Sequence, residues 1–202
     1  MIMKRVLLIF AMIVLSCGAS IAQERSLIKG FSGGMMIHSG YQTGCDNPFG
    51  YNMQGATLGI GGVARLHLTD HFRTGFEGYV STLGLKRNIE KGSHNKIFWT
   101  GLLTDWYWQK GKYFPYLGIT VGGGMETSYL MFDGSSKDWQ AEGDAVFRKA
   151  GFVAVDPFVG CDIALSDAVR LTFKMDWLLA IRKDGLNKPY GPRLYVGFIF
   201  AH

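Results

Sequence analysis

Serine and histidine are the side chains in this sequence best suited to catalysis, because a hydrolytic site needs a Ser nucleophile within hydrogen-bond reach of a His base. His38 and Ser39 are adjacent, and adjacent residues of a strand point to opposite faces. His67 has no clear serine partner. The sequence contains no HExxH motif, CxxC pair or phosphate-binding loop. We therefore predict that the protein is not an enzyme and holds no metal or cofactor.

Acidic and basic residues form the second set with chemical potential, and they alternate with apolar residues. In the stretch VRLTFKMDWLLAIR (169–182), charged and polar residues occupy even positions while apolar residues occupy odd ones. A period of two indicates a strand with one apolar and one ionic face. The same alternation along the chain gives a set of five basic and six acidic residues on ionic faces: Arg65, Arg73, Glu77, Asp105, Glu126, Asp156, Asp162, Arg170, Lys174, Asp176 and Arg193.

The elements that carry these residues are eight strand-like segments, near 30–42, 54–68, 71–85, 95–109, 112–129, 150–165, 168–182 and 192–202. Their connections alternate in length. Three are short turns (68–71, 109–112 and 165–168), and four are long polar stretches (43–52, 86–95, 132–149 and 183–191). Short turns on one side and long loops on the other are typical of outer-membrane barrels. The sequence therefore predicts an all-β, eight-stranded antiparallel up-and-down transmembrane β-barrel.

The orientation of the strands follows from this prediction. A soluble sandwich or a ligand-carrying barrel would turn the apolar faces inward, whereas a membrane barrel turns them to lipid. The alternating connections favour the membrane barrel, so we expect the ionic faces inside and both termini in the periplasm. Trp106 and Trp108 flank a short turn, where an aromatic girdle would lie at the headgroup level. We interpret Gly122-Gly123-Gly124 as relieving crowding in the wall, because no helical pattern follows it.

Two stretches carry a resemblance to a known family. FPYLGITVGGGM (114–125), which follows the QKGK turn, and the last strand, RLYVGFIFAH (193–202), are similar to the small OmpA-like and OmpX-like outer-membrane barrels, a porin-like β-barrel domain. The resemblance covers the chain from about residue 28 to its end. It implies insertion into the bacterial outer membrane by the barrel-assembly machinery through the C-terminal strand. The family usually ends on an aromatic residue, whereas this chain ends on His202.

The first 22 residues have the features of an export signal. Lys4 and Arg5 precede an apolar run from 6 to 15, and small residues end at Ala22. The run is about half the ~20 residues that a membrane-spanning helix needs. We therefore predict a cleaved signal peptide at 1–22 and a barrel domain at 23–202. The alternative is a lipoprotein box with Cys17 as the acylated residue.

The net charge of the chain bears on whether nucleic acid is a partner. Removing Lys4 and Arg5 with the signal leaves 19 basic against 16 acidic residues, and without a basic run this excess does not indicate nucleic acid. Cys45 and Cys161 are predicted to lie near opposite ends of the barrel. A disulfide needs Cα atoms within about 7 Å, so we expect both to be free thiols.

The lumen and the long loops are the candidate functional regions. Because an eight-stranded barrel is just wide enough for its own side chains to fill, and buried charges must pair, we predict a filled, ion-paired lumen in a structural or surface-interaction barrel that displays four long extracellular loops. The alternatives are a small passive channel and a secreted soluble carrier. Basic loop residues could pair with phosphates of outer-membrane lipopolysaccharide: Lys86, Arg87, Lys91, Lys183 and Lys188.

Overall fold

The computed structural model describes residues 28–42, 54–84, 93–131, 145–181 and 190–201. These residues form eight strands: β1 (Gly30–Gln42), β2 (Gly55–His67), β3 (Phe72–Gly84), β4 (His94–Tyr107), β5 (Tyr113–Met131), β6 (Ala145–Ala164), β7 (Val169–Ile181) and β8 (Tyr190–Ala201). Within this part of the chain, no helix is long and apolar enough to cross a membrane.

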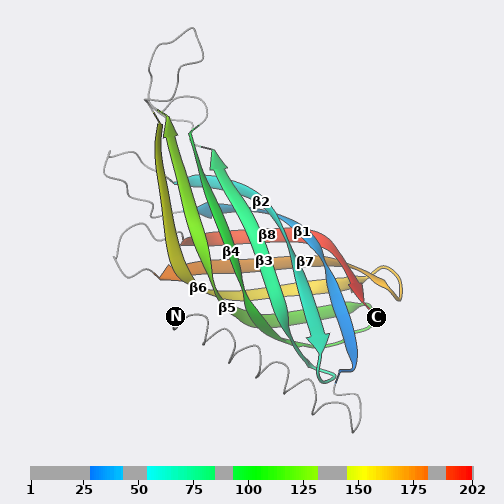
Figure 1. The fold of residues 1–202 in the computed structure, drawn as a ribbon. Coiled ribbons are helices and arrows are strands. Elements are labelled where there is room, and N and C mark those ends of the chain that lie inside the picture. The colour runs from blue at the N-terminus through cyan, green and yellow to red at the C-terminus, as the bar shows by residue number, and fades with distance from the viewer. Residues whose placement is uncertain (1–27, 43–53, 85–92, 132–144, 182–189, 202) are drawn as a thin grey trace, which may run out of the picture.

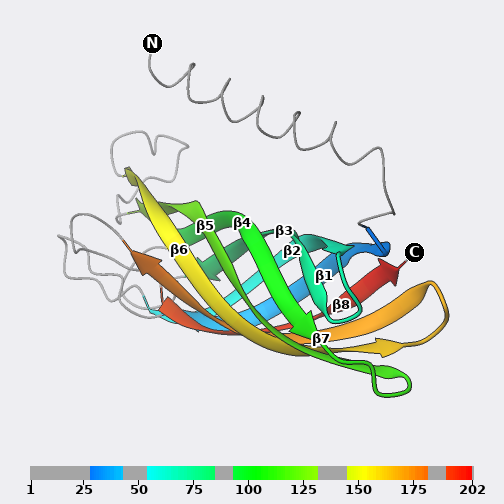
Figure 2. The ribbon, with the colours of Figure 1, turned by 90° about the horizontal axis from the view of Figure 1, so that it is seen from below.

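The strands form one closed antiparallel barrel (Figures 1 and 2). Each strand pairs with the next one along the chain, and β1 pairs with β8 from Ser32↔Ala201 to Gly40↔Arg193. Closure gives every strand two hydrogen-bonded neighbours. Within the described residues, 145–152 of β6 extend past the β7 pairing and are paired on the β5 side alone. The three short turns lie at the same end of the barrel as the C-terminus (Figure 2). The predicted eight-stranded up-and-down architecture is confirmed.

The predicted strand bounds hold within two residues except at the start of β6, which was predicted at 150 and lies at 145. The sequence predicts a connection over 132–149, but residues 145–149 continue β6 and pair with 127–131 of β5. The polar composition of this stretch suggested a loop, whereas the cross-strand pairing makes it a strand. The rings of Tyr129 and Phe147 lie 4.8 Å apart across the two strands. β5 has 19 residues, whereas β1 has 13. At about 3.4 Å per residue, β5 is therefore roughly 20 Å longer than β1.

The apolar faces of the strands point outward and the ionic faces point inward. Leu58, Ile37 and Leu194 are 69%, 65% and 61% exposed, whereas Arg65 and Asp162 are 0% exposed. This distribution is the reverse of a soluble protein, in which exposed apolar patches are small. It matches the lipid-facing band of a membrane barrel and contradicts the alternative of a soluble carrier with an apolar cavity.

Glycines make room for large aromatic side chains inside this narrow barrel. A Cβ at Gly160 would overlap the Tyr116 ring and hydroxyl, and one at Gly61 would overlap the Tyr79 ring. The interpretation of 122–124 holds at Gly122, where a Cβ would overlap the main chain of β4. At Gly160 and Gly61, the missing side chain therefore leaves room for an aromatic ring inside the barrel.

Candidate functional site in the barrel lumen

The lumen contains the charged residues that the alternation predicted there. Ten of the eleven are buried, and Arg170, near the short turns, is half-buried. Nine of them form two groups of ion pairs. We call Arg65, Arg73, Asp105 and Asp162 the turn-side network, and Glu77, Asp156, Lys174, Asp176 and Arg193 the loop-side network.

The turn-side network joins four strands near the short turns. Arg73 donates from Nε to Asp105 Oδ1 at 2.6 Å and from Nη1 to Asp162 Oδ2 at 3.1 Å. Arg65 lies at longer ion-pair distances from the same two carboxylates, 3.2 and 3.6 Å. Thr172 donates a hydrogen bond of 2.6 Å to the second oxygen of Asp162. Two guanidinium groups therefore face two carboxylates, which compensates the burial of all four charges.

Lys174 is the centre of the loop-side network. Its Nζ lies 2.8 Å from both carboxylate oxygens of Glu77, 3.5 Å from Asp176 and 3.8 Å from Asp156. Arg193 donates to both oxygens of Asp176, at 2.8 and 3.0 Å, and to Asp156 at 3.1 Å. A bidentate guanidinium–carboxylate pair fixes geometry as well as charge. This network connects β3, β6, β7 and β8 across the lumen.

Aromatic rings lie beneath the cations of the lumen, a feature that we did not predict. Lys174 Nζ is 4.5 Å from the centroid of Phe158 and 5.0 Å from that of Tyr195. The same arrangement joins Arg193 to Trp99, Arg65 to Tyr116, Arg73 to Tyr107 and Arg170 to Phe114, at 4.1–4.9 Å. A cation over a desolvated ring face gains about 2 kcal/mol or more. The signal was present in the sequence, because these rings share the strand parity of the charged residues.

Glu126 lies nearer the long connections than the residues of the two networks. It accepts a hydrogen bond of 2.7 Å from the Asn95 amide, which also donates to Ser128 at 2.9 Å. Gln42 donates to Asn95 at 3.4 Å. These contacts form a polar layer across β1, β4 and β5 at the loop end of the lumen.

The structure brings together two Ser–His pairs that sequence spacing did not reveal. His38 Nε2 lies 2.7 Å from Ser81 Oγ, and His67 Nε2 lies 2.9 Å from Ser32 Oγ. The sequence interpretation that His67 has no serine partner is therefore wrong. It failed because Ser32 lies 35 positions away on β1, and only the β1–β2 register, which pairs Ser32 with Arg65, brings it next to His67. Ser39 points to the outer face, as the alternation predicted.

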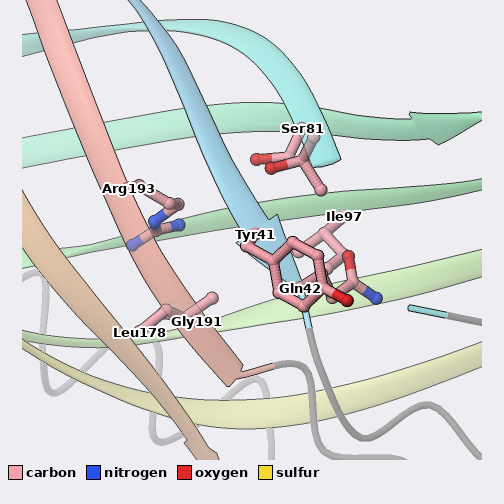
Figure 3. Close-up of a pocket in the computed structure, with 8 residues that line it drawn as sticks. Tyr41, Gln42, Ser81, Ile97, Leu178, Gly191 and Arg193 are labelled. Atoms are coloured by element: carbon pink, nitrogen blue, oxygen red, sulfur yellow. The ribbon is translucent and has the colours of Figure 1, made fainter. Parts of the chain in front are cut away.

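The size of a cavity beside Ser81 decides whether a substrate can reach the His38–Ser81 pair. The cavity lies at the loop end of the lumen, where side chains from several strands converge (Figure 3), and its volume is about 20 Å³. One water molecule needs roughly 10–15 Å³, so the cavity accommodates about one water. His38 and Ser81 are only 3% and 4% exposed. The pair is therefore a hydrogen bond within the filled lumen, without room for an acyl substrate. The lining residues are Tyr41, Gln42, Thr57, Ser81, Ile97, Leu178, Gly191 and Arg193.

Other predicted residues lie on the outer wall or beyond the described part of the chain. Cys161 is a free thiol on β6, partly exposed on the outer face. In the described ranges, no group of three His, Cys, Asp or Glu residues could hold a metal ion. Cys17, Cys45 and the signal segment 1–22 fall outside the described residues, as do all five basic residues predicted to contact lipopolysaccharide: Lys86, Arg87, Lys91, Lys183 and Lys188.

The chain is similar to solved structures of small outer-membrane barrels. The chain is similar to Neisserial surface protein A, with a TM-score of 0.56 and 12% identity over 85% of this chain and 96% of that one. It is also similar to Ail, the attachment invasion locus protein of Yersinia pestis, solved with the heparin analogue sucrose octasulfate, with a TM-score of 0.53 and 11% identity over 87% of this chain and 100% of that one. No family model matches the sequence, and no curated protein matches it. The chain thus has the fold of the small eight-stranded outer-membrane β-barrels.

Proposed function

We propose that the protein is an integral barrel of the bacterial outer membrane, exported by a signal peptide at 1–22. Its filled lumen gives it a structural or surface-interaction role, in which a rigid barrel presents four long connections outside the cell. The main support is the reversed distribution of polarity: exposed apolar side chains surround a lumen of buried ion pairs. Such a surface is stable only when lipid covers it.

The filled lumen favours a structural barrel over a passive channel. A path for ions would need a continuous water-filled passage, whereas the two networks join opposite walls through contacts of 2.6–3.8 Å. The cavity beside Ser81, at the loop end of the lumen, accommodates about one water molecule. The lumen charges therefore contribute to folding of the barrel rather than to conduction.

The proposed partners follow from this location. We infer that the C-terminal strand, with Phe198 and Phe200 exposed on its outer face, is presented to the barrel-assembly machinery. We also infer that lipopolysaccharide surrounds the loop end of the barrel. The complex of Ail with a sulfated sugar is a precedent within this fold for an anionic glycan ligand.

Two measurements test the proposal. In membranes separated by density, the protein should occur in the outer-membrane fraction and resist extraction with salt and alkali; recovery in the soluble pool would refute it. A protease added to whole cells should cut within 132–144 and spare the turn at 109–112. The opposite pattern would reverse the orientation.

A further inference from the structure

The outer wall of the barrel has two charged side chains among the strand residues that the structure describes. They are Lys96 on β4 and Lys149 on β6, and both are exposed. The other outward positions of the described strands carry apolar or uncharged polar residues, apart from the imidazole of His94. A charged side chain on a lipid-facing wall is costly at the bilayer midplane and tolerated near the interface. The height of Lys96 and Lys149 on the wall therefore indicates where the membrane interface lies.

The strand register places the two lysines in one row. Lys96 pairs with Thr127 of β5, and Thr127 pairs with Lys149. Neighbouring strands are about 4.8 Å apart, so the two Cα atoms are separated by roughly 10 Å with a threonine between them. Among the described residues, neither ammonium group forms an ion pair with a carboxylate. Lys149 Nζ lies 5.2 Å from the Phe147 ring centroid.

Aromatic and apolar rows border the lysines. On the loop side, His94, Tyr129 and Phe147 form a continuous row, with ring centroids 4.9 and 4.8 Å apart. On the other side, Phe98 and Met125 continue the apolar wall. The sequence of rows is thus apolar, cationic and aromatic toward the loop end. Aromatic residues concentrate at the membrane–water interface, which indicates that the lysines lie at the level of lipid headgroups.

The height of the row agrees with this assignment. Trp106, an exposed residue near the short turns where we expect the aromatic girdle, is ten residues from Lys96 on β4. At about 3.4 Å per residue and a strand tilt of about 40°, the separation along the barrel axis is roughly 26 Å. The apolar band of an outer-membrane barrel is about 25 Å tall. Lys96 therefore lies at the upper boundary of the band.

We propose that Lys96, Thr127 and Lys149 bind the phosphate groups of a glycolipid headgroup in the outer leaflet, with the rings of Tyr129 and Phe147 against its sugars. Two ammonium groups supply charge and hydrogen-bond donors to phosphate, and the Thr127 hydroxyl supplies a third donor position. This inference rests on the proposed outer-membrane location, and it assigns lipid binding to the barrel wall in addition to the loops.

The test uses the full mature protein, refolded in neutral detergent micelles and titrated with fluorescent lipopolysaccharide. K96Q/K149Q is compared with K110Q/K112Q, which removes the same charge from exposed positions at the short turns. A basic residue near an anionic membrane surface contributes about fivefold in affinity, so the first variant, which loses two, should bind about 25-fold more weakly. The control should change less than twofold, and K96R/K149R should retain most of the affinity.

Further arms identify the ligand. Lipopolysaccharide stripped of its phosphates should bind the wild type about as weakly as intact lipopolysaccharide binds K96Q/K149Q, and millimolar inorganic phosphate should not displace the intact lipid. Equal losses in K96Q/K149Q and K110Q/K112Q, or no loss in either, would overturn the proposed site. Insertion of K96Q/K149Q into phosphatidylcholine vesicles is measured in parallel. If the variant inserts normally and binds like the wild type, the phosphate site is wrong; if the wild type does not insert, the proposed membrane location is wrong.

Discussion

Replacing Lys174 with methionine removes the central cation of the loop-side network. The methionine side chain has similar length but no charge. In the wild type, Nζ lies 2.8 Å from both oxygens of Glu77 and within 3.8 Å of Asp156 and Asp176. After the substitution, these three buried carboxyl groups face Arg193 as the remaining cation of the network. The variant therefore leaves negative charge uncompensated where water has little access.

The expected cost is large for a single substitution. Removing one partner of a buried ion pair destabilises a protein by about 3–5 kcal/mol. With a guanidinium chloride slope of about 3 kcal/mol per molar, the unfolding midpoint should fall by roughly 1–1.7 M. Lys174→Met together with Glu77→Gln should recover much of the loss. The neutral amide can still accept the hydrogen bond that Thr120 donates to Oε1 in the wild type, and no unpaired carboxylate remains at residue 77.

The assay is guanidinium unfolding of refolded barrels in vesicles, followed by tryptophan fluorescence. Lys112→Met is the matched control, because Lys112 is exposed in a short turn and surface substitutions usually change stability by less than about 0.5 kcal/mol. Equal midpoints for Lys174→Met and Lys112→Met would refute the account of a dry, ion-paired lumen. So would a double variant less stable than Lys174→Met alone.

Three further predictions concern the wall and the turns. Gly160→Val should destabilise the barrel by about 1–3 kcal/mol in the same unfolding assay, because the valine side chain would overlap the Tyr116 ring. Gly84→Ala should be nearly neutral, because the space around its Cβ is open. A larger loss of stability in Gly84→Ala than in Gly160→Val would contradict the packing. Lys29 donates a hydrogen bond to Asp70 and thereby lowers the pKa of this carboxyl group in the turn. The pair therefore stabilises the folded barrel at a pH above the ordinary carboxyl pKa. This stabilisation is lost as the pH falls through the lowered pKa of Asp70. Lys29→Gln should raise the pKa of Asp70 toward its ordinary value in a carboxyl NMR titration, and an unchanged pKa would exclude the contact as its cause. In a Cys45→Ser background, Cys161 should resist a water-soluble maleimide in vesicles and react after unfolding; rapid labelling of the folded barrel would place this thiol in water.

The sequence predicted which face of each strand is inside, because alternation is a local property. Asp176 and Lys174 belong to the ionic face of β7 whatever the rest of the chain does. The partner of Lys174 could not be predicted in the same way: Glu77 is 97 positions away, and their contact depends on the register of every intervening strand pair. The same reason hid the pairing of His38 with Ser81, which spans 43 positions.

Other differences between prediction and structure concern how high a residue lies along the barrel, not which face of its strand it occupies. Arg170 has the parity of a lumen residue, yet it is half-buried because it is the second residue of β7, close to a short turn. Phe147 and Lys149 were predicted in a loop from their polar surroundings, but pairing with Tyr129 and Thr127 makes them part of β6. Alternation assigns the face of a residue, and strand pairing decides how far each strand extends.

The most direct test of the filled lumen is the conductance of the refolded wild-type barrel in a planar lipid bilayer. Because the ion pairs join opposite walls and the cavity beside Ser81 accommodates about one water molecule, the protein should insert and leave the current at background, with no discrete steps at either polarity. Insertion is verified on the same sample by protease protection of the strands. Reproducible current steps whose size or ion preference changes in Lys174→Met would show a water-filled lumen lined by the loop-side network and would contradict the account.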